Sequence, residues 1–139
     1  MTHVRRALLG LAFVAYVGLV LLVVLAPTPT VASSVVIEVI DVGRRLGVPE
    51  ALLVGTRVEF ALNTLMVVPV SLLGSLLWPA LSWRDWLAIG FIGSAAVELA
   101  QGLLLPERSA TFVDIVANAL GAGVGAIVVV AGRALIARG

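Results

Sequence analysis

The 139-residue chain is too apolar for a water-soluble domain, because 61% of its residues are hydrophobic and only 12% are charged. Its nine basic residues are all Arg and it has no Cys, which excludes lysine nucleophiles, thiolate catalysis and cysteine-ligated metals. The single histidine, His3, argues against imidazole catalysis, and a net charge of +1 gives no reason to expect nucleic acid as a partner. We therefore expect a single membrane domain over residues 1–139.

The first apolar stretch, residues 7–26, is uncharged and follows a basic start. It ends where Pro27 and Pro29 prevent the helix from continuing. A cleaved signal peptide is the alternative, but its apolar region is shorter, and residues 30–34 make a poor cleavage site. The pattern favours a retained membrane anchor.

Residues 31–56 carry too many charges to span a membrane. Apolar residues recur there at helical spacing, with acidic and basic residues between them, which is typical of an amphipathic helix in the membrane interface. The apolar positions are Val31, Val35, Val39, Val42 and Leu46, and the charged ones are Glu38, Asp41, Arg44 and Arg45. A loop helix packed on the bundle is an equally good interpretation.

Three further apolar stretches reach membrane length, which takes about 20 helical residues. They cover residues 57–78, 86–105 and 112–131. Each carries two polar side chains three or four positions apart, so that both lie on one side of a helix. The pairs are Glu59 with Asn63, Glu98 with Gln101, and Asp114 with Asn118. The expected fold is all-α, a polytopic membrane bundle of four transmembrane helices plus the amphipathic helix.

Small residues recur every four positions in the last two spans. Ala117, Gly121 and Gly125 form one stripe, and Gly90 with Ser94 forms another. Such stripes let helices approach closely. Because the link between these two spans is short, we expect the stripes to pack the two spans together rather than to form a homodimer.

The placement of Arg residues indicates the orientation. With the amino terminus in the cytoplasm, five Arg lie inside and four outside, and the outer four lie among acidic residues. The start of the first span, with Arg5 and Arg6, usually dominates. We therefore expect both termini in the cytoplasm. All three polar pairs then lie in the outer leaflet, and a reversed orientation would still leave them in one leaflet.

The polar pattern resembles the VanZ-like family of small membrane proteins. The residues that carry the resemblance in the last two spans are Glu98, Gln101, Arg108, Asp114, Asn118 and Gly121. Arg57, Glu59, Asn63 and Pro69 extend it into the second span, and Pro27 ends a matching amino-terminal anchor. The resemblance implies a bundle in the bacterial cytoplasmic membrane. The member that gives the family its name is associated with resistance to the lipoglycopeptide teicoplanin.

Two interpretations of the polar residues stay open. Ion pairs of Arg108 with Asp114 or Glu98, and of Arg57 with Glu59, could simply connect the helices. Acids in a membrane cost from about 2.5 kcal/mol each, however, and Ser, Thr or Asn would connect helices at lower cost. We therefore favour an outer-leaflet pocket. Its predicted residues are Glu59, Asn63, Glu98, Gln101, Arg108, Asp114 and Asn118.

The leading hypothesis is a protein that binds an amphiphilic envelope ligand, namely a lipid headgroup, a wall precursor or a lipoglycopeptide such as teicoplanin. Arg108 would contact an anionic group, while Glu98 and Asp114 would hold Arg108 and accept hydrogen bonds. The alternative is a membrane hydrolase or transferase that uses Glu98 and Asp114 as acid and base.

Other kinds of site are less well supported by the pattern. We expect no metal, because the acids have equally good Arg partners, and we expect no cofactor. Transport is disfavoured because the polar residues stop in one leaflet. Nothing in the pattern indicates an oligomeric state.

Overall fold

A computed structural model of the chain describes residues 2–26, 30–105 and 111–138. Within these ranges all regular structure is helical, and four helices are long and apolar enough to cross a membrane. The elements are α1 (His3–Val24), α2 (Thr30–Arg45), the short 3-10 helix η1 (Glu50–Leu52), α3 (Gly55–Leu77), α4 (Trp83–Leu104) and α5 (Phe112–Ile136). The expected all-α membrane bundle is confirmed, and the four spans are α1, α3, α4 and α5.

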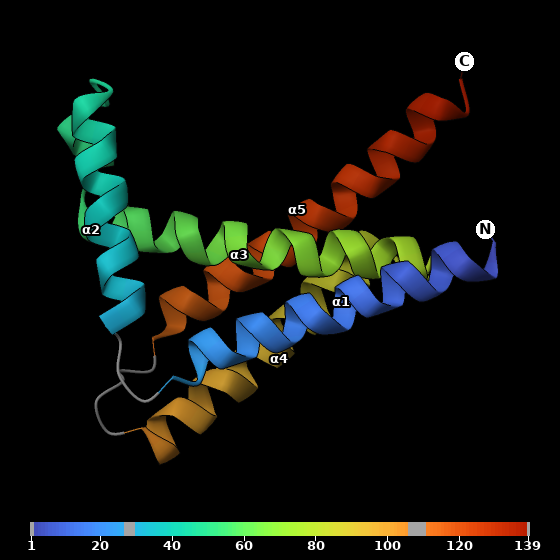
Figure 1. Cartoon of the computed structure of the whole chain (residues 1–139), viewed down its shortest axis with the longest axis horizontal. Helices are drawn as coiled ribbons and strands as arrows, with labels where there is room; N and C mark the ends of the chain where they lie inside the picture. Colours follow the sequence, from blue (N-terminus) through green and yellow to red (C-terminus); the bar gives the residue numbers. More distant parts are fainter. Residues whose placement is uncertain (1, 27–29, 106–110, 139) are drawn as a thin grey trace.

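Helix α5 is the centre of the bundle. It packs against α3 and against α4, whereas α1 lies along α3, as Figure 1 shows. The two chain ends lie at the same end of the molecule. The opposite end holds α2, the starts of α3 and α5, and the ends of α1 and α4.

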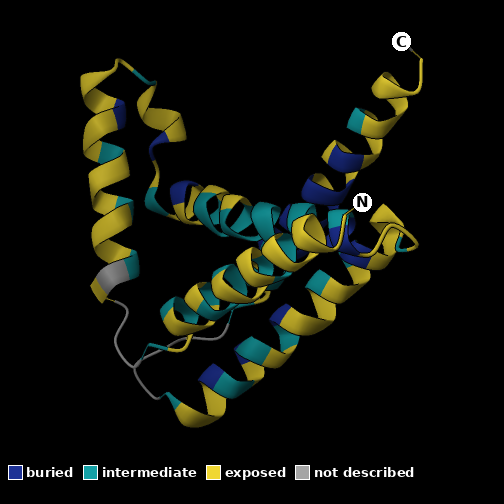
Figure 2. Ribbon diagram, turned by 45° about the vertical axis from the view of Figure 1, so that its right-hand side comes forward, coloured by how far each residue is buried: buried dark blue, intermediate teal, exposed yellow. Residues whose placement is uncertain are grey.

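The surface of the spans is apolar, as a lipid environment requires. Helix α1 has no buried residue, and large side chains such as Leu11 and Leu22 are more than two-thirds exposed. In Figure 2 the buried residues gather where α5 crosses its neighbours, while α1 is mostly exposed. So much exposed apolar surface is stable against hydrocarbon and would not be stable against water.

Glycines set the close contact between α5 and α3. A Cβ atom added at Gly121 would collide with the backbone oxygen of Thr64, and one at Gly125 would collide with Ser71 and the backbone of α3. These two glycines therefore face α3. The expectation that their stripe packs against the neighbouring span α4 was wrong, because the spacing of small residues marks a helix face but not the helix that covers it.

The second stripe does pack α4 against α5. A Cβ added at Gly90 would meet Ala122 and the backbone of Ala119, and Ser94 faces Asn118. At the other end of the bundle, the ring of Trp86 on α4 fills the space left by Gly74 on α3. Small residues thus allow the close contacts of α5 with α3 and α4, and one contact between α3 and α4.

Helix α2 extends away from the bundle at a steep angle to α3 (Figure 1) and is mostly exposed. Its Gly43 is covered by Leu53, which follows η1. Arg44 forms ion pairs with Asp41 at 3.6 Å and with Glu50 at 3.1 Å. The hydrogen bond and charge of Glu50 raise the pKa of Arg44 above its ordinary value. The amphipathic helix is therefore present, and its place in the membrane interface stays a prediction.

Candidate functional site

Two acidic side chains, those of Glu98 and Asp114, accept hydrogen bonds from Thr111, the residue directly before α5. The backbone N–H of Thr111 donates to Glu98 Oε2 at 2.8 Å, and the Thr111 hydroxyl donates to Asp114 Oδ2 at 2.6 Å. The Asp114 N–H donates back to Thr111 Oγ1 at 3.2 Å, so Thr111 is the N-cap of α5. One residue thus positions one carboxylate from α4 and one from α5.

Helix α3 contributes a third side chain to the same place. The Asn63 amide nitrogen donates to Asp114 Oδ1 at 2.6 Å. Asn63 and Asp114 are 51 residues apart in the chain, and their contact ties the starts of α3 and α5 together. We call the group formed by Asn63, Glu98, Thr111 and Asp114 the acid–amide cluster.

Thr111 was not among the site residues predicted from the sequence. The signal was present, because Thr111 followed three residues later by Asp114, directly before an apolar run, is the usual pattern of a capped helix start. The capping interaction satisfies an N–H group that would otherwise lack a partner. It also places the Thr111 N–H where Glu98 can accept it.

Gln101, which was expected on the same side of α4 as Glu98, donates its hydrogen bond outside the cluster. Both residues are buried, with 7% of Glu98 and 5% of Gln101 exposed. The Gln101 amide nitrogen donates to the backbone oxygen of Val24 at 2.6 Å. Val24 is the last residue of α1, where carbonyl groups lack a partner within the helix. Gln101 therefore holds α1 against α4.

Asn118 lies one turn further along α5 than Asp114. Its amide nitrogen donates to the Ser94 hydroxyl at 2.8 Å, and its amide oxygen is buried without a hydrogen-bond partner among the described residues. The hydroxyl of Ser94 can donate as well as accept, so either orientation of the amide leaves one of its two polar atoms unpaired. Asn118 thus joins α4 to α5 without touching the acids in any hydrogen bond.

Of the remaining predicted residues, Glu59 lies outside the cluster, and Arg108 lies outside the described part of the chain. Glu59 is exposed, and the ion pair expected between it and Arg57 is not among those of the described chain. Arg57 donates instead to the backbone oxygen of Ala51. Arg108 lies in residues 106–110, outside the described part, so its predicted contacts with Glu98 and Asp114 stay predictions.

A family model described as VanZ/LLP1 matches residues 13–135, a range that includes all seven predicted site residues. The chain belongs to the VanZ/LLP1 family. No curated protein and no solved structure matches it. The resemblance seen in the polar pattern is therefore confirmed, and the cluster of this VanZ/LLP1 chain has to be interpreted from its own geometry.

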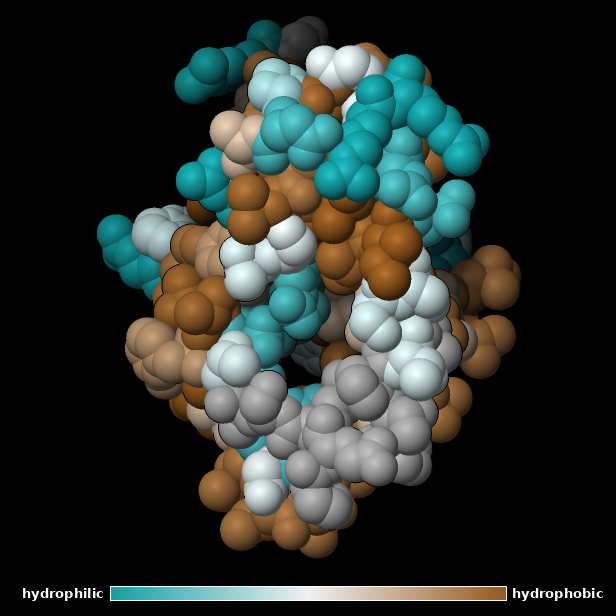
Figure 3. Space-filling view, turned by 90° about the vertical axis from the view of Figure 1, so that its left-hand side faces the viewer, coloured by the Kyte–Doolittle hydropathy of each residue, from teal (hydrophilic) through white to brown (hydrophobic). Residues whose placement is uncertain are grey.

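The cluster of this VanZ/LLP1 protein is rich in hydrogen-bond acceptors. Asn63 and Thr111, which donate to the Asp114 carboxylate, are neutral, and the ion pairs within the described ranges do not involve Asp114. The same ranges contain no group of three or more His, Asp or Glu residues that could hold a metal ion. Seen from this end of the molecule, hydrophilic side chains lie along part of the edge of a small hollow (Figure 3).

Proposed function

We propose that the protein binds the polar group of an amphiphilic envelope ligand at the acid–amide cluster. The observation that supports the proposal is the surroundings of Asp114. Its carboxylate is partly exposed and accepts hydrogen bonds from two neutral groups, Asn63 and Thr111. A ligand that brings hydroxyl or ammonium donors would complete this site.

The free energies favour binding over a purely structural role. A carboxylate within a membrane costs from about 2.5 kcal/mol. A hydrogen bond between membrane helices contributes only about 0.6 kcal/mol on average. A neutral side chain in place of Asp114 could also accept hydrogen bonds from Asn63 and Thr111 and so connect α3 to α5. A carboxylate is therefore not needed for helix packing. The free-energy cost of the carboxylate is explained if a donor group of a bound ligand offsets it.

The ligand classes that fit are a lipid headgroup, a lipid-linked wall precursor and a lipoglycopeptide such as teicoplanin. Each joins many hydroxyl or amine donors to an apolar part. On the basis of the sequence alone, the proposal also includes Arg108, which would contact an anionic group of the ligand. The alternative, hydrolysis or transfer with Glu98 and Asp114 as acid and base, is an outcome of the same experiment.

The cluster lies at the end of the bundle opposite both chain ends (Figure 1). With the termini in the cytoplasm, as the Arg residues indicate, this end is in the outer leaflet of the bacterial cytoplasmic membrane. That leaflet is where wall precursors are used and where a lipoglycopeptide arrives.

The proposal is tested by binding to purified, delipidated protein, measured by native mass spectrometry. The probes are phosphatidylethanolamine, an undecaprenyl-linked wall precursor and teicoplanin. We expect wild type to retain at least one probe, and Asp114→Asn to bind it at least tenfold more weakly, because the amide carries no charge and accepts fewer hydrogen bonds.

The matched control is Asp85→Asn, the same chemical change at the start of α4. Asp85 belongs to the capping box with Ser82, at the end of the molecule away from the cluster. This variant should bind like wild type. The proposal is wrong if wild type retains none of the probes, or if Asp114→Asn binds as tightly as the control.

The enzymatic alternative would be established if wild type turned over the wall precursor and if this turnover were lost in Glu98→Gln and in Asp114→Asn.

A further inference from the structure

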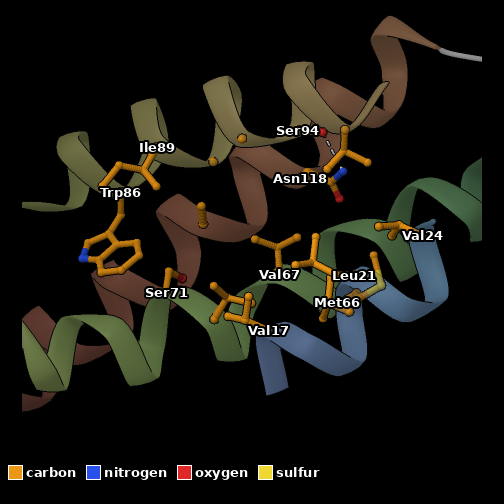
Figure 4. A pocket seen from close by; sticks show the side chains of 16 residues that line it. Val17, Leu21, Val24, Met66, Val67, Ser71, Trp86, Ile89, Ser94 and Asn118 are labelled. Carbon is orange, nitrogen blue, oxygen red and sulfur yellow. Dashed lines mark hydrogen bonds between the residues drawn. The ribbon is translucent and has the colours of Figure 1, made fainter. Parts of the chain in front are cut away.

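An apolar cavity lies beside the acid–amide cluster, toward the middle of the bundle. Its volume is about 220 Å³, and its walls come from all four spans (Figure 4). Val17 and Leu21 of α1 face Val67 of α3 across one part of it, and Trp86 and Ile89 of α4 form another wall. Almost all of the exposed wall is apolar.

The packing of the helices explains the cavity. Helices α3 and α4 both pack on α5, but they make few contacts with each other, and α1 packs more closely on α3 than on α4. A gap therefore lies between α1 and α4, and α5 lines its inner side. Gly90 and Gly93 leave two positions on the α4 side of this gap without a side chain.

Water is a poor occupant of this space. A space of this volume would hold several waters, and each buried water needs about two to four polar partners. Among the polar groups of the wall residues, only the Trp86 indole N–H and the Asn118 amide oxygen lack a hydrogen-bond partner within the described ranges, which is too few for so many waters. Ser71 donates to the backbone oxygens of Val68 and Gly121, and the Ser94 hydroxyl is bonded to Asn118. A helix about 10 Å wide is too large for the space. A hydrocarbon chain fits the wall chemistry and the volume.

The cavity begins where the cluster ends. Asn118 lies on its wall and is one turn, about 5.4 Å, further along α5 than Asp114. On α4 the wall residue Val97 directly precedes Glu98. A ligand whose polar group binds the acids therefore has its attached chain at the opening of the cavity.

We infer that this cavity binds one hydrocarbon chain, acyl or isoprenoid, of the amphiphile whose polar group binds at the acid–amide cluster. The inference rests on the proposed function and adds to it that the ligand is a lipid recognised by its chain as well as by its headgroup. The chain enters from the bilayer through the gap between α1 and α4.

Gly93 offers a way to fill the cavity without disturbing the fold. It lies on the cavity wall, and a Cβ atom placed there has no heavy atom within 4 Å. Gly93→Leu therefore occupies the space that a ligand chain would use. Gly18→Leu is the matched control, because Gly18 has equally open surroundings and is not a wall residue.

The probe is phosphatidylethanolamine with a diazirine in the middle of one acyl chain, incorporated with the protein in proteoliposomes and activated by light. Peptide mass spectrometry locates the labelled residues. In wild type we expect labels on wall residues such as Met66 and Val97. We expect Gly93→Leu to reduce this labelling at least fivefold and Gly18→Leu to leave it unchanged. Competition by undecaprenyl phosphate against the labelled acyl lipid separates an isoprenoid chain from an acyl chain.

Asp114→Asn, in the same assay, separates the inference from the proposed function. Loss of wall labelling in both Gly93→Leu and Asp114→Asn supports the inference. If Asp114→Asn binds the ligand more weakly but Gly93→Leu shows undiminished wall labelling, the inference is wrong. The proposed function then still holds. Loss in Gly93→Leu with wild-type behaviour of Asp114→Asn shows a chain site without a headgroup site, which overturns the proposed function and the link between the two. Labels confined to lipid-facing residues such as Leu11 in wild type also overturn the inference.

Discussion

Thr111 contributes to the cluster through two different groups. Its hydroxyl caps α5 and donates to Asp114, while its backbone N–H donates to Glu98. The side chain can therefore be changed without removing the bond to Glu98. This separation makes Thr111 a direct test of how much the cap contributes.

Thr111→Val keeps the shape of the side chain and removes its hydroxyl. We expect the free energy of unfolding to fall by about 1 kcal/mol, the usual effect of losing an N-cap. Thr111→Ser keeps the hydroxyl and should stay within a few tenths of a kcal/mol of wild type, since Ser caps helices as well as Thr. Reversible unfolding in mixed detergent micelles measures both values. Equal losses in the two variants would show that the hydroxyl does not stabilise α5.

The contact between Asn63 and Asp114 was predictable from the positions of the two residues within their spans. Asp114 and Asn63 were expected at one depth because the rise of a helix fixes how far each lies from the end of its span. The partner of Gln101 was not predictable, because it is a backbone carbonyl at the end of α1, which no side-chain pattern marks. Glu59 lies on the same side of α3 as Asn63, one turn nearer the start of the helix, but is exposed, since the spacing alone does not show how far along that side the packing extends.

At the level of the helices, the contact between α3 and α5 depends on Gly121. The backbone oxygen of Thr64 occupies the position that a Cβ would take there. A backbone atom cannot move aside as a flexible side chain can. The spacing of small residues predicted close packing correctly, whereas α3 as the covering helix became evident only from the arrangement of all four spans.

Gly121→Ala should force α3 and α5 apart. We expect a loss of roughly 1–3 kcal/mol in the free energy of unfolding, the usual effect of overpacking. Gly132→Ala, in the same helix but with no heavy atom within 4 Å of the added Cβ, should match or slightly exceed wild type. Thermal unfolding in detergent compares the two variants. A Gly121→Ala protein as stable as Gly132→Ala would contradict the close contact.

For the whole molecule, span number and span length followed from hydropathy because the bilayer thickness sets how many apolar residues a helix needs. The four spans begin and end within a few residues of the expected positions, and α1 and α5 are longer at their terminal ends. The arrangement of the spans around α5 could not be predicted, because apolar faces in lipid do not identify their neighbours by hydropathy.

The orientation can be tested cleanly because the chain contains no Cys. Single cysteines introduced as Thr2→Cys and Arg138→Cys mark the chain ends, and Ala51→Cys marks the end near α2; all three positions are exposed. We expect a membrane-impermeant maleimide to label Ala51→Cys on intact cells. The other two should react only after the membrane is opened. The reverse pattern would place the acid–amide cluster in the inner leaflet.

The central position of α5 has a consequence for how the protein is made. Helices α3 and α4 precede α5 in the chain, yet they make few contacts with each other, and each packs mainly on α5. Until α5 has been synthesised and inserted, Asn63 and Glu98 lack the partners that Thr111 and Asp114 provide. We therefore expect the bundle to assemble in one late step in the bilayer, after the ribosome has translated α5, rather than helix by helix during translation.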